Sequence, residues 1–291
     1  MPGILASGPS FSTMNLWRGA SQLGQRQCSG SCAKGVPGAW LMVNTLIGGT
    51  LSAGGANAIN MVVDRDIDRL MERTKNRPLV TGAVSPREAL VFAVVIEVVA
   101  FAWLTVTVNL FSAVLAVAAC LFYVFVYTLW LKRTSRQNIV IGGAAGAVPV
   151  LVGWAAVTNS LAWTPVILFA MVFAWTPPHF WALAIRYADD YRAASVPMLP
   201  AVETAGNTAR SMLRYTVVLW ALSELLAPVA HLGVLYLVVA NILGAGFVWM
   251  VSTLLRDPSP KRSMATFSYS ISYVTVLFLA MAGDVVLRNG W

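Results

Sequence analysis

The chain consists of repeated apolar runs separated by short polar connections. Each run has about twenty residues, which is the length that an α-helix needs to cross the hydrocarbon core of a bilayer. The pattern predicts eight spans, at residues 38–63, 88–108, 112–131, 138–157, 161–185, 214–230, 233–255 and 265–287. We therefore predict an all-α fold, a polytopic transmembrane helical bundle.

Composition and charge agree with this class. Hydrophobic residues make up 58% of the chain and charged residues only 11%, which excludes a soluble domain. The net charge of +8 is concentrated in alternate connections, so it is a signal of membrane topology and does not indicate a nucleic-acid partner. By the positive-inside rule the basic connections are cytoplasmic. They are residues 64–87, 132–137, 186–214 and 256–264.

The first residues of the chain differ from the rest. Residues 1–37 contain no apolar span and no acidic residue, so we predict a poorly ordered tail before a transmembrane domain at 38–291. Counting spans places this tail outside, although it carries Arg18, Arg26 and Lys34, against the positive-inside rule. A first span that is missing or replaced explains this inconsistency better than export of the tail.

Charged residues gather in the stretch from Asn60 to Leu79, which holds four acidic and five basic side chains. Asn60, Asp64 and Asp68 are spaced by four residues, so on a helix they share one face. Oxygen ligands at a membrane boundary suit Mg²⁺, which leaves its other positions to water and substrate phosphate. Three basic side chains follow within three turns and can hold the rest of a diphosphate: Arg73, Lys75 and Arg77.

A second acidic pair, Asp189 and Asp190, follows the exit of the span at 161–185. Two acidic clusters at one membrane face suggest two metal-binding walls around one diphosphate. The alternative is that these acids only solvate their loop or pair with nearby arginines. Between the clusters, Lys132 lies at the end of a span, where it either snorkels to the interface or reaches the diphosphate, and Tyr127 can contribute a hydroxyl.

Three further polar residues lie inside predicted spans. His179 follows Pro177 and Pro178, which we expect to kink or break the helix and to open a cavity. This histidine can bind a metal or haem iron, act as a base, or donate a hydrogen bond to a neighbouring helix, and spacing alone favours the last role. Glu97 and Glu224 are expected to face the bundle interior, without an assigned role.

Four stretches give the chain a resemblance to a known family. They are DRDIDRLMERTKNRPL at 64–79, YTLWLKRTSRQNIVIGGAAGA at 127–147, HFWALAIRYADDY at 179–191 and VPMLP at 196–200. On these stretches the chain resembles the UbiA superfamily of intramembrane prenyltransferases, and within it the protoheme IX farnesyltransferases, or haem O synthases. The resemblance extends from about Gly38 to the end of the chain.

The resemblance implies a bundle, usually of nine spans, around a central cavity open to the cytoplasmic face of the bacterial cell membrane. It implies transfer of a farnesyl group from farnesyl diphosphate to a vinyl group of haem B, with addition of water. The product, haem O, serves terminal oxidases, and a downstream haem A synthase is an implied partner. The implied ligands of Mg²⁺ are Asn60, Asp64, Asp68 and Asp190. The implied diphosphate contacts are Arg73, Arg77, Lys132 and Arg186, and the implied catalytic residues are Asp64, Asp68, Lys132 and His179.

The chain departs from the family pattern at its beginning. Family members have a first span with a basic motif before the segment that starts here at Gly38, and nothing in this sequence resembles it. We therefore expect one wall of the cavity to be absent. For this reason the alternative that the chain is a non-catalytic remnant of such an enzyme stays open. Two different functions also stay open. One is a UbiA-type enzyme acting on an aromatic quinone precursor, and the second is a transporter using Glu97 and Glu224 as a proton relay.

Overall fold

The computed structural model describes residues 37–289. The predictions for the tail, including its order and the missing first span, lie outside this range. Within it, eight helices are long and apolar enough to cross a membrane, and no residue is in a strand. The prediction of an all-α, polytopic transmembrane bundle is confirmed.

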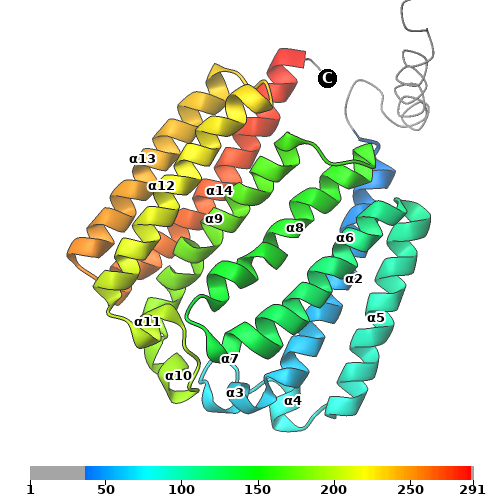
Figure 1. Cartoon of the computed structure of the whole chain (residues 1–291), viewed down its shortest axis with the longest axis vertical. Helices are drawn as coiled ribbons and strands as arrows, with labels where there is room; N and C mark the ends of the chain where they lie inside the picture. Colours follow the sequence, from blue (N-terminus) through cyan, green and yellow to red (C-terminus); the bar gives the residue numbers. More distant parts are fainter. Residues whose placement is uncertain (1–36, 290–291) are drawn as a thin grey trace, which may run out of the picture.

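The long helices run side by side, and the short ones gather at one end of the bundle, away from the C-terminus (Figure 1). The long helices are α2 (Ala39–Val63), α5 (Pro86–Thr107), α6 (Leu110–Leu121), α8 (Asn138–Thr158), α9 (Trp163–Arg186), α12 (Ala205–Val229), α13 (Val234–Arg256) and α14 (Pro260–Asn289). Helix α6 continues through a π-helix, η2 (Phe122–Leu131), into α7 (Lys132–Thr134). The other short helices are α3 (Arg65–Leu70), α4 (Pro78–Thr81), α10 (Ala188–Ala193) and α11 (Leu199–Val202). We call the end formed by α3, α4, α7, α10 and α11 the charged end.

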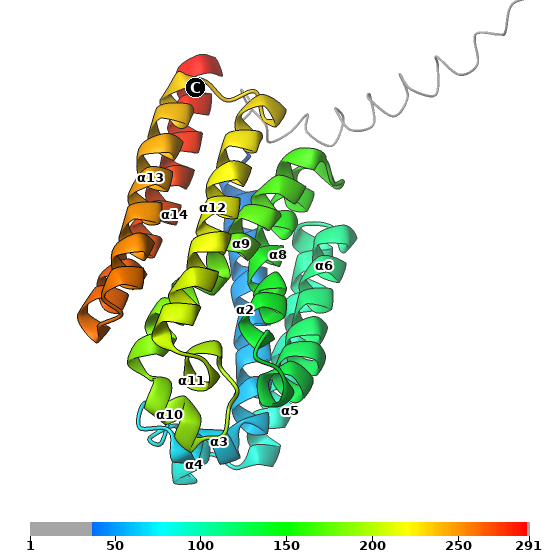
Figure 2. The ribbon, with the colours of Figure 1, turned by 60° about the vertical axis from the view of Figure 1, so that its left-hand side comes forward.

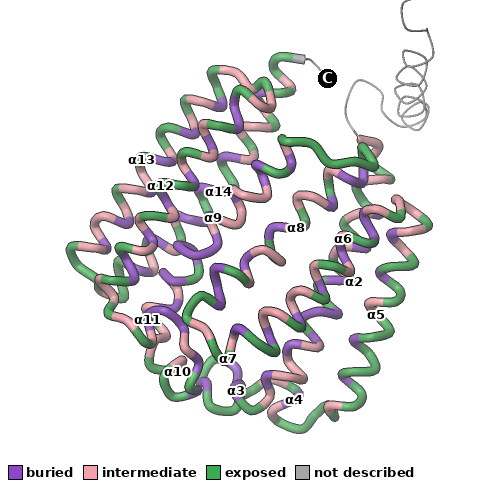
Figure 3. Tube along the Cα trace, in the orientation of Figure 1, coloured by how far each residue is buried: buried purple, intermediate pink, exposed green. Residues whose placement is uncertain are grey.

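The side of each helix that packs inward carries the buried residues. Helix α9 packs against α8, α12 and α14, whereas α2 packs mainly against α5 and also against α6 and η2. Figure 2 shows α13 and α14 as a pair at the edge of the bundle. Exposed positions lie on the outward sides of the helices, along most of α5 for example (Figure 3), and many of them are large and apolar. Such outward faces are suited to contact with lipid.

Helix α12 begins at Ala205, well before the start at 214 that its apolar run predicts. Its first turns are polar, and the hydroxyl of Thr204 caps them by accepting a hydrogen bond of 3.2 Å from the backbone N–H of Asn207. An apolar run marks only the part of a helix that lies in lipid, which is why the predicted start is wrong. Arg210 and Arg214 therefore lie on a helix and not in a loop.

Helix α9 is continuous through Pro177 and Pro178, so of the predicted kink or break the break does not occur. Each proline removes only its own N–H donor, and packing of α8, α12 and α14 around α9 holds the surrounding turns in place. The hydroxyl of Thr176 donates to the carbonyl of Val172 at 2.9 Å just before the pair. Both prolines are buried in this contact region.

Candidate active site

The end of α2 and the start of α3 hold the predicted oxygen array. The backbone N–H of Asp64 donates to the carbonyl of Asn60 at 2.9 Å, and that of Asp68 donates to the carbonyl of Asp64 at 2.8 Å. Because this helical bonding is kept across the junction, the three side chains share one face, as their spacing predicts. That face is buried, with exposed fractions of 7% for Asn60, 0% for Asp64 and 3% for Asp68.

A second helix segment supplies the partners of this array. The amide of Asn60 donates to Asp64 Oδ2 at 2.6 Å and to the hydroxyl of Thr128 at 3.1 Å. The ammonium group of Lys132 forms an ion pair with the same carboxylate of Asp64. Asn60 and Asp64 are four positions apart, and so are Thr128 and Lys132. The Asn60–Thr128 and Asp64–Lys132 contacts therefore lie side by side between α2 and the segment that ends in α7.

The π-helix η2 brings these partners to the face that packs on α2. One turn further into the bundle, Ala56 of α2 packs against Cys120 and Val124. Cys120, Val124, Thr128 and Lys132 are spaced by four residues, and in an α-helix such a series turns away by about 40° at each step. The wider turns of a π-helix offset this rotation, and π-helical turns are frequent at functional sites.

Asp64 and Asp68 each have a basic partner. The ion pair of Lys132 with Asp64 is largely buried, since the lysine side chain is only 16% exposed and the aspartate 0%. Arg77 Nη1 lies 2.7 Å from Asp68 Oδ2, and the hydroxyl of Thr74 donates to the carbonyl of Asp68 at 3.0 Å. The array therefore combines two buried carboxylates with two cations in direct contact.

Arg133 binds the outer side of the same turn. It donates two hydrogen bonds of 2.7 Å to Asp66 and one of 3.0 Å to the carbonyl of Val63, and its Nη2 lies 3.7 Å from Asp64 Oδ1. The hydrogen bond and the charge of Arg133 lower the pKa of Asp66 to about 2. This exposed pair fixes the junction between α2 and α3.

The two charged loops meet at the charged end. Ile67 and Met71 pack in one apolar cluster with Ala194 and Val196, and Tyr191 lies against it. Burial raises the pKa of the Tyr191 hydroxyl, and the nearby charge and hydrogen bond of Arg73 oppose this shift. The loop that follows α9 is thus held next to the loop that follows α2.

Not every predicted residue of the second loop touches the array. Asp189 pairs with Arg192, and Asp190 is half-buried. The guanidinium of Arg186 lies 5.9 Å from the ring centroid of Tyr187. No hydrogen bond or ion pair among the described residues joins Asp190 or Arg186 to Asp64 or Asp68. The structure brings together Asn60, Asp64, Asp68, Arg77 and Lys132, and it leaves Arg73, Arg186 and Asp190 at the same end without direct contact to the carboxylates.

His179 lies at the contact between α9 and α14. Its ring stacks on Trp175 and Phe267, with centroid distances of 4.1 and 4.6 Å, and its Nδ1 lies 2.7 Å from the hydroxyl of Ser270. These contacts match the structural role, a hydrogen bond to a neighbouring helix. None of the described contacts joins His179 to the array, and a catalytic role for it stays a prediction.

Tyr127 is fixed against α8 by the absence of a side chain at Gly142. A Cβ atom at Gly142 would collide with the Tyr127 ring, so only glycine permits this approach. The ring also stacks on Tyr123, with centroids 5.3 Å apart. Gly143 permits a similar close approach to Thr176 of α9, whereas a Cβ at Gly146 would have no neighbour within 4 Å.

The donor set of the array fits Mg²⁺. Asp64 Oδ1 is buried and has no hydrogen-bond partner among the described residues, which leaves an acceptor free for a cation. Among the same residues no group of three His, Cys, Asp or Glu side chains is placed to hold a metal. Two carboxylates and an amide agree with a site that takes its remaining oxygen ligands from water and a substrate phosphate, as Mg²⁺ sites do.

The sequence interpretation missed Thr128, Arg133 and Tyr191 as members of this region. The sequence could have indicated Thr128, because it precedes Lys132 by four residues and therefore shares a helix face with it. Arg133 and Tyr191 had none, because their contacts depend on how separate loops pack.

Comparison with known proteins identifies the class. The model of the UbiA prenyltransferase family matches residues 30–281, and the chain belongs to this family of membrane prenyltransferases. A protein of Clavibacter michiganensis subsp. michiganensis named protoheme IX farnesyltransferase is 51% identical over 256 residues, which cover 87% of this chain and 84% of that protein.

Solved structures share the fold. A UbiA homologue from Aeropyrum pernix K1 aligns with a TM-score of 0.65 at 20% identity, over 86% of this chain and 90% of its own. A UbiA homologue from Archaeoglobus fulgidus, bound to DMAPP and Mg²⁺, aligns with a TM-score of 0.55 at 16% identity, over 82% of this chain and 89% of its own.

Proposed function

We propose that this chain transfers a farnesyl group from farnesyl diphosphate to a vinyl group of haem B, with addition of water, to give haem O. The observation that carries the proposal is the buried Asp64. Asn60 and Lys132 hold one of its oxygens, and the other accepts no hydrogen bond from the described residues, in a chain about half identical to proteins named protoheme IX farnesyltransferase. A buried acid that keeps one oxygen free of hydrogen bonds beside cations is suited to a metal-bound diphosphate.

The residues of the array have distinct proposed roles. Asn60, Asp64 and Asp68 would hold Mg²⁺, and Asp190 of the second loop is the fourth proposed ligand. Arg77 and Lys132 contact the diphosphate, and Arg73 and Arg186 join them from the exposed rim. When bound, Mg²⁺ would supply positive charge that stabilises the departing diphosphate. A homologue from Archaeoglobus fulgidus was solved with DMAPP and Mg²⁺ bound.

Charge stabilisation is the chemistry that these side chains provide. Departure of diphosphate leaves an allylic cation at C1 of the farnesyl chain, and the electron-rich vinyl carbon of haem B attacks it. The resulting carbocation takes up water, which then loses a proton to give the hydroxyethylfarnesyl group. Cations fixed by buried carboxylates are preorganised for the developing negative charge on the leaving group.

The proposed setting is a bacterial cell membrane with the charged end in the cytoplasm, where farnesyl diphosphate is available. The outward apolar faces contact the bilayer, and haem B is a substrate and not a resident cofactor. A downstream haem A synthase is the proposed receiver of the product.

A membrane assay tests the proposal. Residues 1–291 are expressed as a whole, membranes are supplied with haem B, farnesyl diphosphate and Mg²⁺, and haem O is measured by mass spectrometry. We expect haem O to form, and to disappear with EDTA. Asp64→Ala should lower the rate at least about 100-fold, the size of effect seen when one preorganised charge-stabilising group is lost.

Asp66→Ala is the matched control, because it removes an acid two positions away whose side chain is 64% exposed. It should keep most of the activity. Prenylation of an aromatic quinone precursor in place of haem B would support the quinone-directed enzyme. If the folded protein prenylates neither haem B nor a quinone precursor, the chain would be a non-catalytic remnant of the enzyme.

A further inference from the structure

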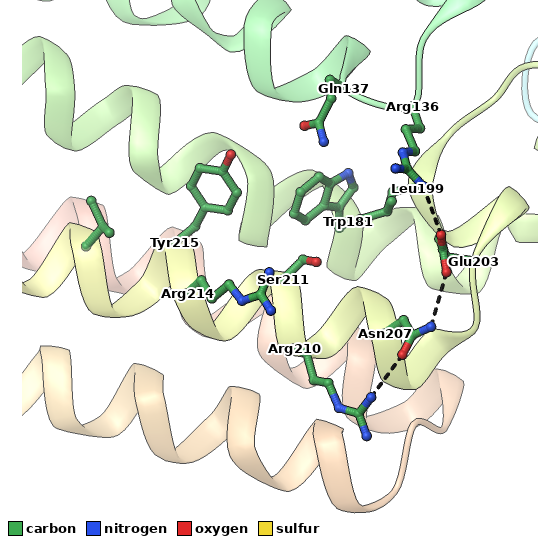
Figure 4. A pocket seen from close by; sticks show the side chains of 11 residues that line it. Arg136, Gln137, Trp181, Leu199, Glu203, Asn207, Arg210, Ser211, Arg214 and Tyr215 are labelled. Atoms are coloured by element: carbon green, nitrogen blue, oxygen red, sulfur yellow. Dashed lines mark hydrogen bonds and ion pairs between the residues drawn. The ribbon is translucent and has the colours of Figure 1, made fainter.

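A cavity of about 610 Å³ lies at the charged end, apart from the Asn60, Asp64 and Asp68 array. Its walls come from the loop before α8, from α9 and α11, and from the first half of α12 (Figure 4). Three arginines line it against a single acid: Arg136, Arg210 and Arg214 against Glu203. This lining favours an anion, and the cavity is in the size range of pockets that take small molecules.

The arginines are only partly neutralised. Arg136 pairs with Glu203 at 3.1 Å, and Asn207 bridges the same acid to Arg210 with two hydrogen bonds of 3.1 Å. Arg214 forms no hydrogen bond or ion pair with any residue that the structure describes. These contacts, drawn as dashed lines in Figure 4, hold the guanidinium groups of Arg136 and Arg210 and do not include that of Arg214.

A buried donor in the wall lacks a partner. The Trp181 side chain is 1% exposed, and its indole nitrogen forms no hydrogen bond with the described residues. Figure 4 shows this nitrogen on the side of the ring nearer to Gln137 and Arg136. A buried N–H without an acceptor costs free energy, so an acceptor oxygen supplied by a bound molecule would satisfy it.

The cavity continues into an apolar surface. Asn207, Arg210, Arg214 and Val218 lie on one stripe of α12, so its charged part leads directly to an apolar part within the span. Val218 and, further along, Leu225 are each 49% exposed. A free anion would make no use of this apolar surface, whereas a lipid would place its acyl chains on it.

We propose that this cavity binds the phosphate headgroup of an anionic phospholipid, with its acyl chains along α12. Arg210 and Arg214 would contact the phosphate and the Trp181 N–H would donate to one of its oxygens. Basic pockets between transmembrane helices are suited to such headgroups. The proposal concerns a site separate from the array and does not depend on the proposed reaction.

The test compares lipids bound to the full chain. Protein in nanodiscs with equal amounts of dioleoylphosphatidylglycerol and dioleoylphosphatidylcholine is released and examined by native mass spectrometry. We expect retained phosphatidylglycerol to exceed phosphatidylcholine. The double variant Arg210→Gln/Arg214→Gln should lower this preference about 30-fold, roughly fivefold for each arginine. Trp181→Phe, which keeps an aromatic ring, should lower it by a smaller factor.

Arg256→Gln/Lys261→Gln is the matched control, because it removes one charge from the last turn of α13 and one from the first turn of α14. Its lipid preference should equal that of the original chain, and circular dichroism should show equal helix content in all variants. An unchanged preference in the Arg210 and Arg214 variant, or an equal loss in the control, would overturn the proposal. Displacement of phosphatidylglycerol by inorganic phosphate would overturn it in favour of a free anion.

Discussion

Replacement of Lys132 by methionine tests the electrostatic core of the candidate site. The substitution keeps the length of the side chain. It removes the only ammonium group that contacts the fully buried Asp64 within residues 37–289. Breaking a buried ion pair by removing one partner typically costs about 3–5 kcal/mol, because the other charge stays buried. Asp64 keeps the amide of Asn60 and has Arg133 at 3.7 Å, so we expect a loss near about 3 kcal/mol.

Lys75→Met is the matched control for this loss. Lys75 forms an ion pair of 2.5 Å with Glu72, but the two side chains are 48% and 74% exposed. Exposed pairs contribute about 0–1 kcal/mol, so this variant should differ little from the original chain. The assay is reversible unfolding in mixed detergent micelles followed by far-ultraviolet circular dichroism, which gives the free energy of unfolding of each variant.

The double variant Asp64→Asn/Lys132→Met decides between lost charge pairing and lost packing. A neutral pair of similar volume is usually tolerated, so this variant should recover most of the loss and stay within about 1 kcal/mol of the original chain. It should nevertheless form no haem O. The reasoning fails if Lys132→Met costs no more than Lys75→Met, or if the double variant is less stable than Lys132→Met.

Magnesium gives a second readout of the same pair. A divalent cation at Asp64 replaces the positive charge that Lys132→Met removes, so added Mg²⁺ should stabilise this variant more than the original chain. Asp64→Asn/Lys132→Met should not respond. If Mg²⁺ stabilised the original chain, Lys132→Met and the double variant equally, it would act at a place other than Asp64.

Three further predictions concern the surroundings of the site. The pKa of Asp66 is about 2 in the folded protein against an ordinary value of 3.8, so its stabilising effect is complete above about pH 4 and is lost as the pH falls toward 2. The Asp66 side chain is 64% exposed, so Asp66→Asn should lower the free energy of unfolding by less than about 1 kcal/mol relative to the original chain above pH 4. This difference between the two proteins should vanish toward pH 2. Gly142→Ala should cost about 1–3 kcal/mol through collision with Tyr127, whereas Gly146→Ala, with open space at its Cβ, should cost little in the same unfolding assay. His179→Phe keeps the ring stacking, and the Ser270 hydroxyl still has the carbonyl of Phe267 at 2.6 Å, so the free energy of unfolding should change by less than about 1 kcal/mol. At this unchanged stability, loss of haem O formation would assign His179 the predicted catalytic role, and persistence of haem O formation would refute that role.

The order of the spans and the shared face of Asn60, Asp64 and Asp68 were predictable from the sequence. Apolar length sets the number of membrane helices, and a spacing of four residues sets a face whatever the helix packs against. Helix ends were less predictable, because the polar first turns of α12 lie outside the apolar run and are held by the cap at Thr204. The helix does not break at Pro177 and Pro178, because packing of neighbouring helices outweighs the local loss of two donors.

The pairing of individual charges could not be read from the sequence. Lys132 and Arg133 are adjacent, yet one pairs with the buried Asp64 and the other mainly with the exposed Asp66. Which one turns inward depends on the phase of the preceding helix, and nothing in the sequence of Phe122–Leu131 announces a π-helix. The cavity between α9 and α12 was likewise hidden, because Arg210 and Arg214 were expected in a loop.

The π-helix at Phe122–Leu131 makes the winding of this segment a constraint separate from its chemistry. The same residues wound as an ordinary α-helix would be equally apolar and equally able to cross the bilayer. Because an α-helix turns further per residue than a π-helix, Lys132 would then be rotated away from Asp64. Relatives should therefore exchange apolar residues freely here as long as the π-helical turns are kept. A chain that lost these turns would look intact by hydropathy and still lack the charge pair on which the site is built.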